Sequence, residues 1–408
     1  MKPEEMLFCN LMQISLHPDR QNTILQESPE QITKALPQLV ELARLHNMLP
    51  ALCDVLYRLD VPLTADAAEC FSHKIPAICY QCYDMLAFSK KVIAFLDGLS
   101  ITFFVLKGVT LLPAYPKLEY RQYGDVDIFI PDAKEYELAM QSLLAAGFVP
   151  RKDYVDHHIE LTYTIENTTY LLELHNKIIA TQSDRNFQKQ LECIFQNVTP
   201  AYDTFSEAGI RYPMLSPTTN ALYLLLHMLQ HFLSAGFGIK LLYDWVAYLE
   251  RYASDISFEE LQNNINRLGL SGFCNAITRL CLKHLGLSLA KSDLLLTKPL
   301  DDTFLSSFMD DILSAGEFGK TDTARLLIMQ KGGRFSQYFH EFHRQMKNRF
   351  PKAHKIIPLW PFLWLITGFC FVWNNHFLRK TKTSTLLATT KKRQKLLQHL
   401  HLFQTRDN

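Results

Sequence analysis

The sequence has almost no net charge, because 42 lysine and arginine residues balance 41 aspartate and glutamate residues, leaving a formal charge of +1. A chain without a positive field has no general attraction for nucleic acid, and no basic stripe interleaved with aromatic residues lies near the motifs described below. It also lacks an internal repeat and an extended low-complexity segment. We therefore expect an ordinary globular protein of about two to three structural units, for which nucleic acid is an unexpected partner, although the sequence does not exclude one.

The sequence also shows neither the cysteine pattern of a disulfide-bonded protein nor a secretory leader. Nine cysteines, an odd number, are scattered through apolar segments, so we expect reduced and mostly buried thiols. Cys79 and Cys82 have C-x-x-C spacing, but they lie in a helical pattern without a second pair, which favours a packed helix face over a metal site. No basic segment followed by an apolar one comes after Met1, so we expect no secretory leader and a cytoplasmic location.

Two aspartates mark the most informative stretch of the chain, Asp125 and Asp127 in the sequence Gly-Asp-Val-Asp-Ile-Phe-Ile. Successive side chains of a strand point to opposite faces, so the two carboxylates share one face while Val126 and Ile128 enter the core. Like charges side by side cost free energy unless a cation neutralises them, and Mg²⁺ is the usual cation where phosphates are handled. The pair therefore predicts a metal site, and the alternative is two solvated acids on an edge strand.

A Lys-Gly pair precedes these aspartates. Residues 101–106 are β-branched and aromatic and predict a buried strand, which ends at Lys107 and Gly108 before a helix-like segment. Free backbone N–H groups at such a helix start, together with the Lys107 charge, would cradle phosphate. Arg121 would clamp a further phosphate or pair with an acid.

A third carboxylate comes from Glu173, in the stretch Tyr-Leu-Leu-Glu-Leu-His that ends at His175. The preceding apolar run and this one predict a hairpin across a short turn at residues 166–167. With a two-residue turn, Glu160 lies opposite Glu173 and His158 lies opposite His175, so Glu160 is a further candidate near the metal.

The order Leu-Lys-Gly, then Arg, then Asp-x-Asp on an apolar strand and a later Glu-Leu-His resembles the polymerase-beta-type nucleotidyltransferase superfamily. More narrowly, it is similar to bacterial nucleotidyltransferase family proteins. The commoner superfamily pattern has a Gly-Ser or Gly-Gly turn and a shorter gap to the first Asp. The resemblance implies an α+β fold in which a polymerase-beta-like core, a small mixed sheet with helices, lies between two helical regions.

The same resemblance implies an activity and its residues. A nucleoside monophosphate would move from an NTP such as ATP to an unknown acceptor, with release of pyrophosphate. Asp125, Asp127 and Glu173 would be catalytic and would bind two Mg²⁺ ions, with Glu173 also helping to take the proton of the acceptor. Lys107 and Gly108 would steady the triphosphate, with Arg121 as a further clamp.

The domain organisation follows from the helical and strand patterns. We expect an N-terminal helical region over residues 1–97, the nucleotidyltransferase core over 98–212, a C-terminal helical region over 213–350, and an apolar helix with a basic tail over 351–408. The expected core includes a helix from Ala133 to Ala146.

Two residue pairs in the C-terminal helical region are candidates for contact with the substrate. His227 and His231 lie four apart on a helix, and polar residues that line a helical seam or close a pocket are favoured over a metal site. Lys240 and Asp244 also lie four apart, and we expect an intrahelical ion pair. The segment around Lys240 and Asp244 resembles a family segment that would wall the nucleotide or acceptor.

The tail combines an apolar run with a basic flank. Residues 356–373 are apolar, with tryptophans toward both ends, and seven basic residues follow without an acid among them: Arg379, Lys380, Lys382, Lys391, Lys392, Arg393 and Lys395. Such a segment suits an anionic membrane surface. Pro358 and Pro361 argue against a full span, so we expect peripheral membrane attachment or a protein partner through residues 356–395.

One alternative function is compatible with the same residues. A catalytically silent nucleotidyltransferase-fold module would bind nucleotide, or none, and act as a scaffold or membrane-recruitment protein. Mg²⁺-dependent NTP binding and turnover distinguish the two hypotheses.

Overall fold

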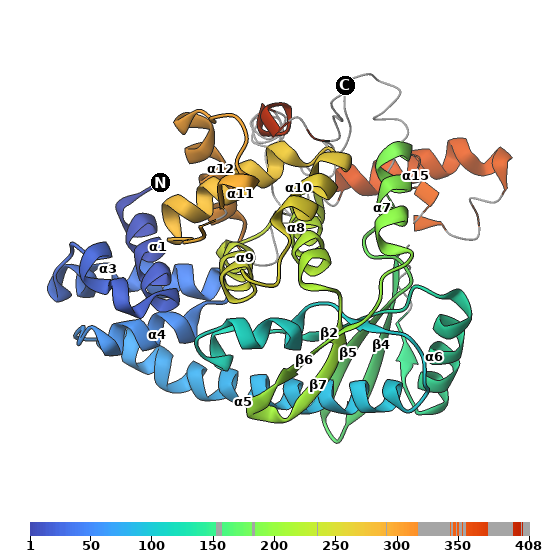
Figure 1. Cartoon of the computed structure of the whole chain (residues 1–408), viewed down its shortest axis with the longest axis horizontal. Helices are drawn as coiled ribbons and strands as arrows, with labels where there is room; N and C mark the ends of the chain where they lie inside the picture. The colour runs from blue at the N-terminus through green and yellow to red at the C-terminus, as the bar shows by residue number, and fades with distance from the viewer. Residues whose placement is uncertain are drawn as a thin grey trace.

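The structure is a computed structural model of the whole chain. It describes residues 1–151, 157–181, 184–234, 236–290, 292–316, 343, 346–347, 349–350, 353, 356–373, 395–400 and 402. Among these residues, helices predominate and surround a small mixed sheet, so the expected α+β fold class is confirmed (Figure 1).

The chain begins with helices, as the sequence predicted: α1 (Pro3–Leu16), α2 (Gln21–Ile24), α3 (Pro29–Leu45), α4 (Leu49–Arg58) and α5 (Ala65–Asp97). Local chemistry fixes two of their starts. Ser28 and Gln31 form a capping box at α3, and the Thr64 side chain accepts from the Ala67 N–H at α5. The helix α5 is long enough to reach from the N-terminal helices to the sheet (Figure 1).

The main sheet has five strands in the order β1-β2-β5-β4-β3. These are β1 (Phe104–Val105), β2 (Asp125–Phe129), β3 (Val149–Pro150), β4 (His158–Ile165) and β5 (Thr168–His175), with α6 (Ala133–Ala145) between β2 and β3. The β2 and β5 strands are parallel, and the other neighbours are antiparallel. The strand expected over residues 101–106 is therefore shorter, whereas the helix expected from Ala133 is confirmed.

The predicted hairpin has the predicted register. Its turn consists of Glu166 and Asn167, and Glu166 adopts a positive φ of 51°. Glu160 pairs with Glu173, and His158 pairs with His175, across the β4–β5 ladder. The assumption of a two-residue turn was enough to predict both pairs, because each residue added to a hairpin turn shifts the pairing of the strands.

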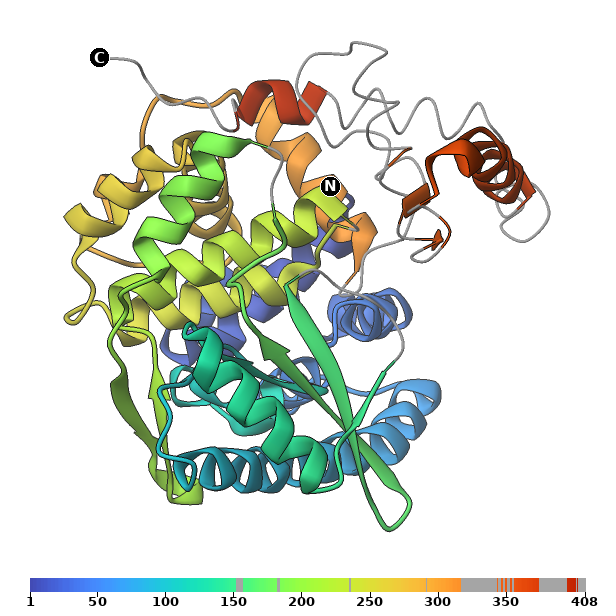
Figure 2. The same cartoon turned by 90° about the vertical axis from the view of Figure 1, so that its right-hand side faces the viewer.

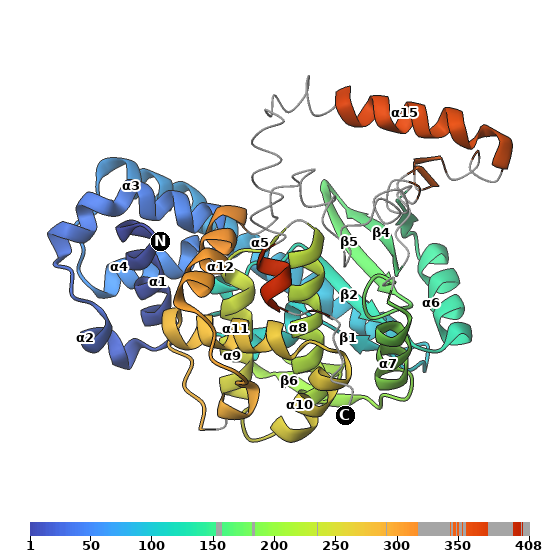
Figure 3. The same ribbon diagram turned by 90° about the horizontal axis from the view of Figure 1, so that it is seen from above.

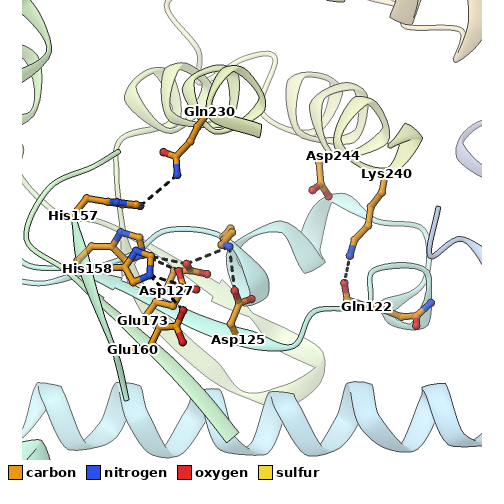
Figure 4. A network of polar contacts seen from close by, with 12 residues as sticks. Gln122, Asp125, Asp127, His157, His158, Glu160, Glu173, Gln230, Lys240 and Asp244 are labelled. Atoms are coloured by element: carbon orange, nitrogen blue, oxygen red, sulfur yellow. Dashed lines mark hydrogen bonds and ion pairs between the residues drawn. The ribbon is translucent and has the colours of Figure 1, made fainter. Parts of the chain in front are cut away.

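Helices cover the two faces of this sheet in different ways. The long helix α5 covers one face, where Phe88 stacks on Tyr170 at a centroid distance of 4.4 Å and Asp84 accepts from the Tyr170 hydroxyl at 2.7 Å. The helices α8 (Pro217–Ser234) and α9 (Ile239–Arg251) lie above the opposite face (Figure 1). The acidic residues of β2 and β5 lie between the sheet and α8 (Figure 4).

A second, two-stranded sheet follows α7 (Arg185–Phe195) and was not predicted. Its strands are β6 (Ala201–Phe205) and β7 (Ile210–Met214), and they pair antiparallel. Pro213 lies inside β7, and the helix α8 starts soon afterwards at Pro217, so the helical region expected from residue 213 begins a few residues later.

The remaining helices pack above the sheet as α10 (Phe258–Arg267), α11 (Ser271–His284) and α12 (Asp302–Ala315). The short helical segment 395–400 packs on them, because Leu396 and Leu400 are buried and His399 stacks on Phe304 at 5.3 Å. The very end of the described chain is thus part of the globule. The boundaries of the four expected regions remain a prediction.

The apolar helix of the tail is α15 (Trp360–Trp373), preceded by a 3₁₀ turn at Ile357–Leu359. It projects away from the body in two views (Figures 2 and 3). Phe362 is 65% exposed and Leu365 is 72% exposed, as expected for a helix with an unburied apolar surface. No helix in the described part of the chain is long and apolar enough to cross a membrane. Of the seven basic residues, Lys395 is described, and the other six lie outside the described residues.

Candidate metal and nucleotide site

Three predicted carboxylates lie on two neighbouring parallel strands. Asp125 and Asp127 project from β2, and Asp127 pairs in register with Glu173 of β5. The apolar residues that alternate with the two aspartates of β2, Val126 and Ile128, are buried on the other side of the strand. The Asp127 side chain is fully buried, whereas that of Asp125 is 26% exposed. The acidic edge therefore runs from the interior toward solvent.

Lys107 supplies the cation that this acidic edge requires. Its Nζ lies 3.2 Å from an Asp125 oxygen and 3.3 Å from an Asp127 oxygen. Burial alone would lower the pKa of Lys107, but the carboxylates of Asp125 and Asp127 outweigh burial and raise that pKa well above its ordinary value. Lys107 is therefore charged and acts as a counter-ion to the acids.

The turn after Lys107 requires glycine but does not form the expected phosphate cradle. Gly108 has a φ of +68°, and a Cβ there would come within 3.2 Å of the Tyr123 ring. The segment Gly108–Ala114 is a short 3₁₀ helix that contains Pro113. Such a segment lacks the aligned N–H groups of an α-helix start, so the prediction of a backbone cradle at Gly108 is not supported.

Two histidines at one end of the hairpin contact the carboxylates. His175 Nε2 lies 3.2 Å from Asp127 Oδ1 and 3.3 Å from Glu173 Oε2, and His158 Nε2 lies 3.8 Å from Glu173 Oε1. Burial would raise the pKa of Glu173, but the His175 hydrogen bond and the Lys107 charge hold it at about 2. Burial would lower the pKa of His175, yet its hydrogen bonds to Asp127 and Glu173 raise it. Glu173 is thus ionised at neutral pH.

The residues that lie close enough to share a metal ion differ from the predicted set, because His175 is among them and Asp125 is not. Asp127, Glu173 and His175 form a group whose ligand atoms all lie within 4.8 Å of one another. Among the described residues, the groups that meet this distance do not include Asp125, which connects to Asp127 through Lys107. Asp127 Oδ2 is buried and has no hydrogen-bond partner in the described part of the chain. An unpaired buried carboxylate oxygen fits a cation at this position.

One face of α8 forms a wall opposite the acids. Tyr223, His227 and His231 recur every four residues, and the His227 and His231 rings meet edge to face at 4.5 Å. Burial and the neighbouring His231 lower the pKa of His227 far below its ordinary value, and burial with the Lys107 charge lowers that of His231 to about 4. Both imidazoles are therefore neutral at pH 7. Among the described residues neither belongs to a metal-ligand group, which agrees with the interpretation that they line a helical seam or close a pocket.

Arg121 and Asp244 form a buried ion pair, so Arg121 takes the second of the two roles expected for it, pairing with an acid. Arg121 Nε and Nη2 lie 2.9 and 3.1 Å from the two oxygens of Asp244, and the Tyr115 hydroxyl also donates to Asp244. The guanidinium is only about 5% exposed, so Arg121 is not placed to clamp a phosphate. The Lys240 ammonium donates to the Gln122 carbonyl at 2.5 Å, a contact outside its own helix (Figure 4). The carboxylate of Asp244 likewise binds the loop before β2, because it accepts from Arg121. These contacts replace the intrahelical ion pair that we expected between Lys240 and Asp244.

Sequence reasoning missed the part of the site that the hairpin and α8 build together. His157 Nε2 lies 3.3 Å from the Gln230 amide nitrogen, and Gln230 comes from α8 (Figure 4). His175 carried a usable signal, because it shares a strand face with Glu173 and therefore points at the same site. No periodicity in the sequence relates Tyr223 to the acids.

The site combines an acid-lined face of two inner strands, a counter-ion lysine and a wall of neutral imidazoles, and its carboxylates and imidazoles are groups that can ligate divalent cations. The family model described as an uncharacterised nucleotidyltransferase matches residues 34–286, which is more than half of the chain and contains every site residue named above. The protein belongs to this nucleotidyltransferase family. No curated protein matches the chain. Among solved structures, an antigenic nucleotidyltransferase-like protein from Paracoccidioides brasiliensis is similar with 15% identity and a TM-score of 0.32, covering 51% of this chain and 94% of that one.

Proposed function

We propose that this protein is a Mg²⁺-dependent nucleotidyltransferase. It transfers a nucleoside monophosphate from an NTP, such as ATP, to an acceptor nucleophile. The bond between the α-phosphorus and the oxygen that bridges to the β-phosphate breaks, a bond from the acceptor to the α-phosphorus forms, and pyrophosphate leaves with the electron pair, while the proton of the acceptor passes to solvent water. Membership of the family supports the reaction class, and the site supports the metal.

One observation carries the proposal. Asp127 and Glu173 stand side by side on parallel strands, with Asp125 at the next same-face position of β2 and a lysine as their counter-charge. Asp125, Asp127 and Glu173 would hold Mg²⁺, which supplies Lewis-acid stabilisation of the charge that develops on the phosphate oxygens. The unpaired Asp127 Oδ2 is the position at which the fold leaves a ligand atom available.

The other residues have positioning and electrostatic roles. Lys107 neutralises the acids in the absence of substrate, and its flexible ammonium is able to turn from a carboxylate to a triphosphate oxygen when a metal takes over the acids. The Tyr223, His227 and His231 wall closes the space opposite the acids. Because a pKa of about 2 makes Glu173 a weak base, we assign it to metal binding rather than to the proton transfer we first expected.

A second function has its own support in the Lys107 geometry. If Lys107 satisfies both aspartates permanently, the protein is a catalytically silent module that binds nucleotide or acts as a scaffold. The distances of 3.2 and 3.3 Å are those of an ion pair that needs no metal. The two functions differ in whether Mg²⁺ and NTP displace Lys107 from the acids.

Asp127→Asn tests the catalytic proposal. The amide keeps the shape of the side chain, so the fold should persist, whereas labelled-NTP turnover in cell extract with Mg²⁺ should fall by about 1,000-fold or more. Asp302→Asn, at a carboxylate that is 86% exposed, is the matched control and should leave turnover unchanged. Equal turnover in Asp127→Asn and in the unmodified protein would refute the assignment. Mg²⁺-dependent NTP binding without turnover in the unmodified protein would support the silent module.

A further inference from the structure

A cluster of three histidines lies directly beside the carboxylates. His158 opens β4 and His175 closes β5, and the two residues pair across the hairpin. His157 precedes β4, and its ring meets that of His158 edge to face at a centroid distance of 4.4 Å. One nitrogen from each of the three rings lies within 4.8 Å of the other two. We call His157, His158 and His175 the histidine cluster.

The cluster contains buried polar atoms without partners. Both ring nitrogens of His158 are buried, and neither has a hydrogen-bond partner among the described residues; the same is true of His175 Nδ1. The nearest carboxylate oxygens to His158 Nε2 lie at 3.8 and 3.9 Å, beyond hydrogen-bond distance. A buried nitrogen without a partner is unfavourable, so the fold maintains an arrangement that protein groups among the described residues do not satisfy.

Surrounding contacts hold the cluster in place. The backbone N–H groups of Asn176 and Lys177 donate to the His157 carbonyl at 3.1 and 3.3 Å, which fixes the entry to β4. Gln230 of α8 contacts the His157 ring, and the Ala180 N–H donates to the Gln230 amide oxygen at 3.3 Å. Ligating histidines usually have such an outer partner that orients the ring. Figure 4 shows His157 and His158 together beside Asp127 and Glu173.

We infer that the histidine cluster binds a borderline divalent cation of the zinc class, at a position distinct from the Mg²⁺ expected at the aspartates. Imidazole nitrogens favour zinc and its neighbours, whereas carboxylate oxygens favour magnesium. Bonds of about 2.0–2.1 Å in tetrahedral geometry place nitrogens roughly 3.3 Å from one another, so binding requires the three rings to move closer than the spacing of up to 4.8 Å that they have here. The inference goes beyond the proposed function, because it concerns cation binding and requires no nucleotide turnover.

The test measures zinc binding to the full chain by competition with a chromophoric chelator. His158→Ala should weaken binding by about 100-fold or more, since it removes a ligand rather than an outer partner. The chain has 15 histidines, so adventitious surface binding needs a control. His73→Ala, at an exposed position of α5, is the matched variant and should bind zinc like the unmodified protein. Equal affinity of His158→Ala and the unmodified protein, or no binding by the latter, would overturn the inference.

Two further measurements keep this test separate from that of the proposed function. Asp125→Asn should abolish turnover but retain zinc affinity, because the contacts of Asp125 run to Lys107 rather than to the histidine cluster. Loss of zinc binding in Asp125→Asn would refute a distinct site. Cobalt bound to the unmodified protein should show nitrogen ligands by electron paramagnetic resonance, a result that stands even if His158→Ala fails to fold. Cobalt held by oxygen ligands alone would also refute the site.

Discussion

Replacing Asp244 with alanine should destabilise the protein strongly, because it leaves the Arg121 guanidinium buried without its counter-ion. The carboxylate accepts two charge-assisted bonds from Arg121, at 2.9 and 3.1 Å, and a third from Tyr115. A hydrogen bond to a charged group contributes about 1.5–3 kcal/mol net, so the two Arg121 bonds contribute about 3–6 kcal/mol. Removing one member of a buried pair costs about 3–5 kcal/mol in general, which agrees.

Urea denaturation followed by circular dichroism measures this loss. A protein of 408 residues with several structural units need not unfold in two states, so the comparison uses midpoints rather than extrapolated free energies. The control is Lys283→Ala, which breaks an ion pair whose two side chains are 51% and 86% exposed. An exposed pair contributes about 0–1 kcal/mol, so this control should scarcely move the midpoint.

A second consequence concerns the active site. Asp244 and Lys240, one helical turn apart on α9, hold Arg121 and the Gln122 carbonyl, which lie just before Asp125. Asp244→Asn keeps an acceptor for Arg121 and should lose less stability than Asp244→Ala, yet both should reduce turnover by displacing Asp125. If the midpoint of Asp244→Ala shifts no further than that of Lys283→Ala, the reasoning about this ion pair is wrong.

The remaining predictions concern pH and the tail. Burial holds the pKa of His231 at about 4, so between pH 6.5 and pH 4 the unfolded chain binds more protons than the folded one, and stability should fall by up to about 3 kcal/mol as pH drops through this range. Because His227 also has a lowered pKa and adds to the same dependence, His231→Gln should reduce its slope in urea midpoints without removing it, and an unchanged slope would contradict the prediction. For the tail, the full chain should sediment with anionic vesicles at low salt and less at high salt. Replacing Phe362, Leu365 and Ile366 together with serine should abolish sedimentation; a chain that never sediments refutes the membrane partner.

The tail experiment uses substitutions because truncation would remove part of the globule. The sequence predicted an apolar helix with a basic tail over residues 351–408, which would attach to a membrane or a partner through residues 356–395. Leu396 and Leu400 are buried, however, and Leu400 packs so closely on Gly272 that a Cβ there would lie 2.2 Å from the Leu400 carbonyl oxygen. Neither the hydropathy of this segment nor its charge pattern indicates which distant helix it meets.

Local rules predicted the parts of the site that depend on neighbouring residues. The alternation of a strand placed Asp125 and Asp127 on one face, and a two-residue turn set Glu160 opposite Glu173. The assignment of Glu173 as the third carboxylate required the family resemblance, because its strand is separated from that of Asp127 by α6, β3 and β4, and its parallel pairing was not predicted. The helical spacing of Lys240 and Asp244 predicted an ion pair between them, and this prediction was wrong. The two side chains instead bind the loop before β2, where Asp244 pairs with the buried Arg121 and Lys240 donates to the Gln122 carbonyl.

The counter-ion lysine connects these observations. Two adjacent carboxylates must be neutralised in every state of the protein, and the fold provides Lys107 for the state described here. A metal that binds the same acids competes with this ammonium, so the affinity for Mg²⁺ includes the free energy needed to displace it. A triphosphate lowers that cost because it gives the displaced ammonium a new anion to contact. From the Lys107 contacts we therefore expect Mg²⁺ and NTP to bind jointly more tightly than either alone if the proposed activity is correct, whereas a silent scaffold would not need this coupling.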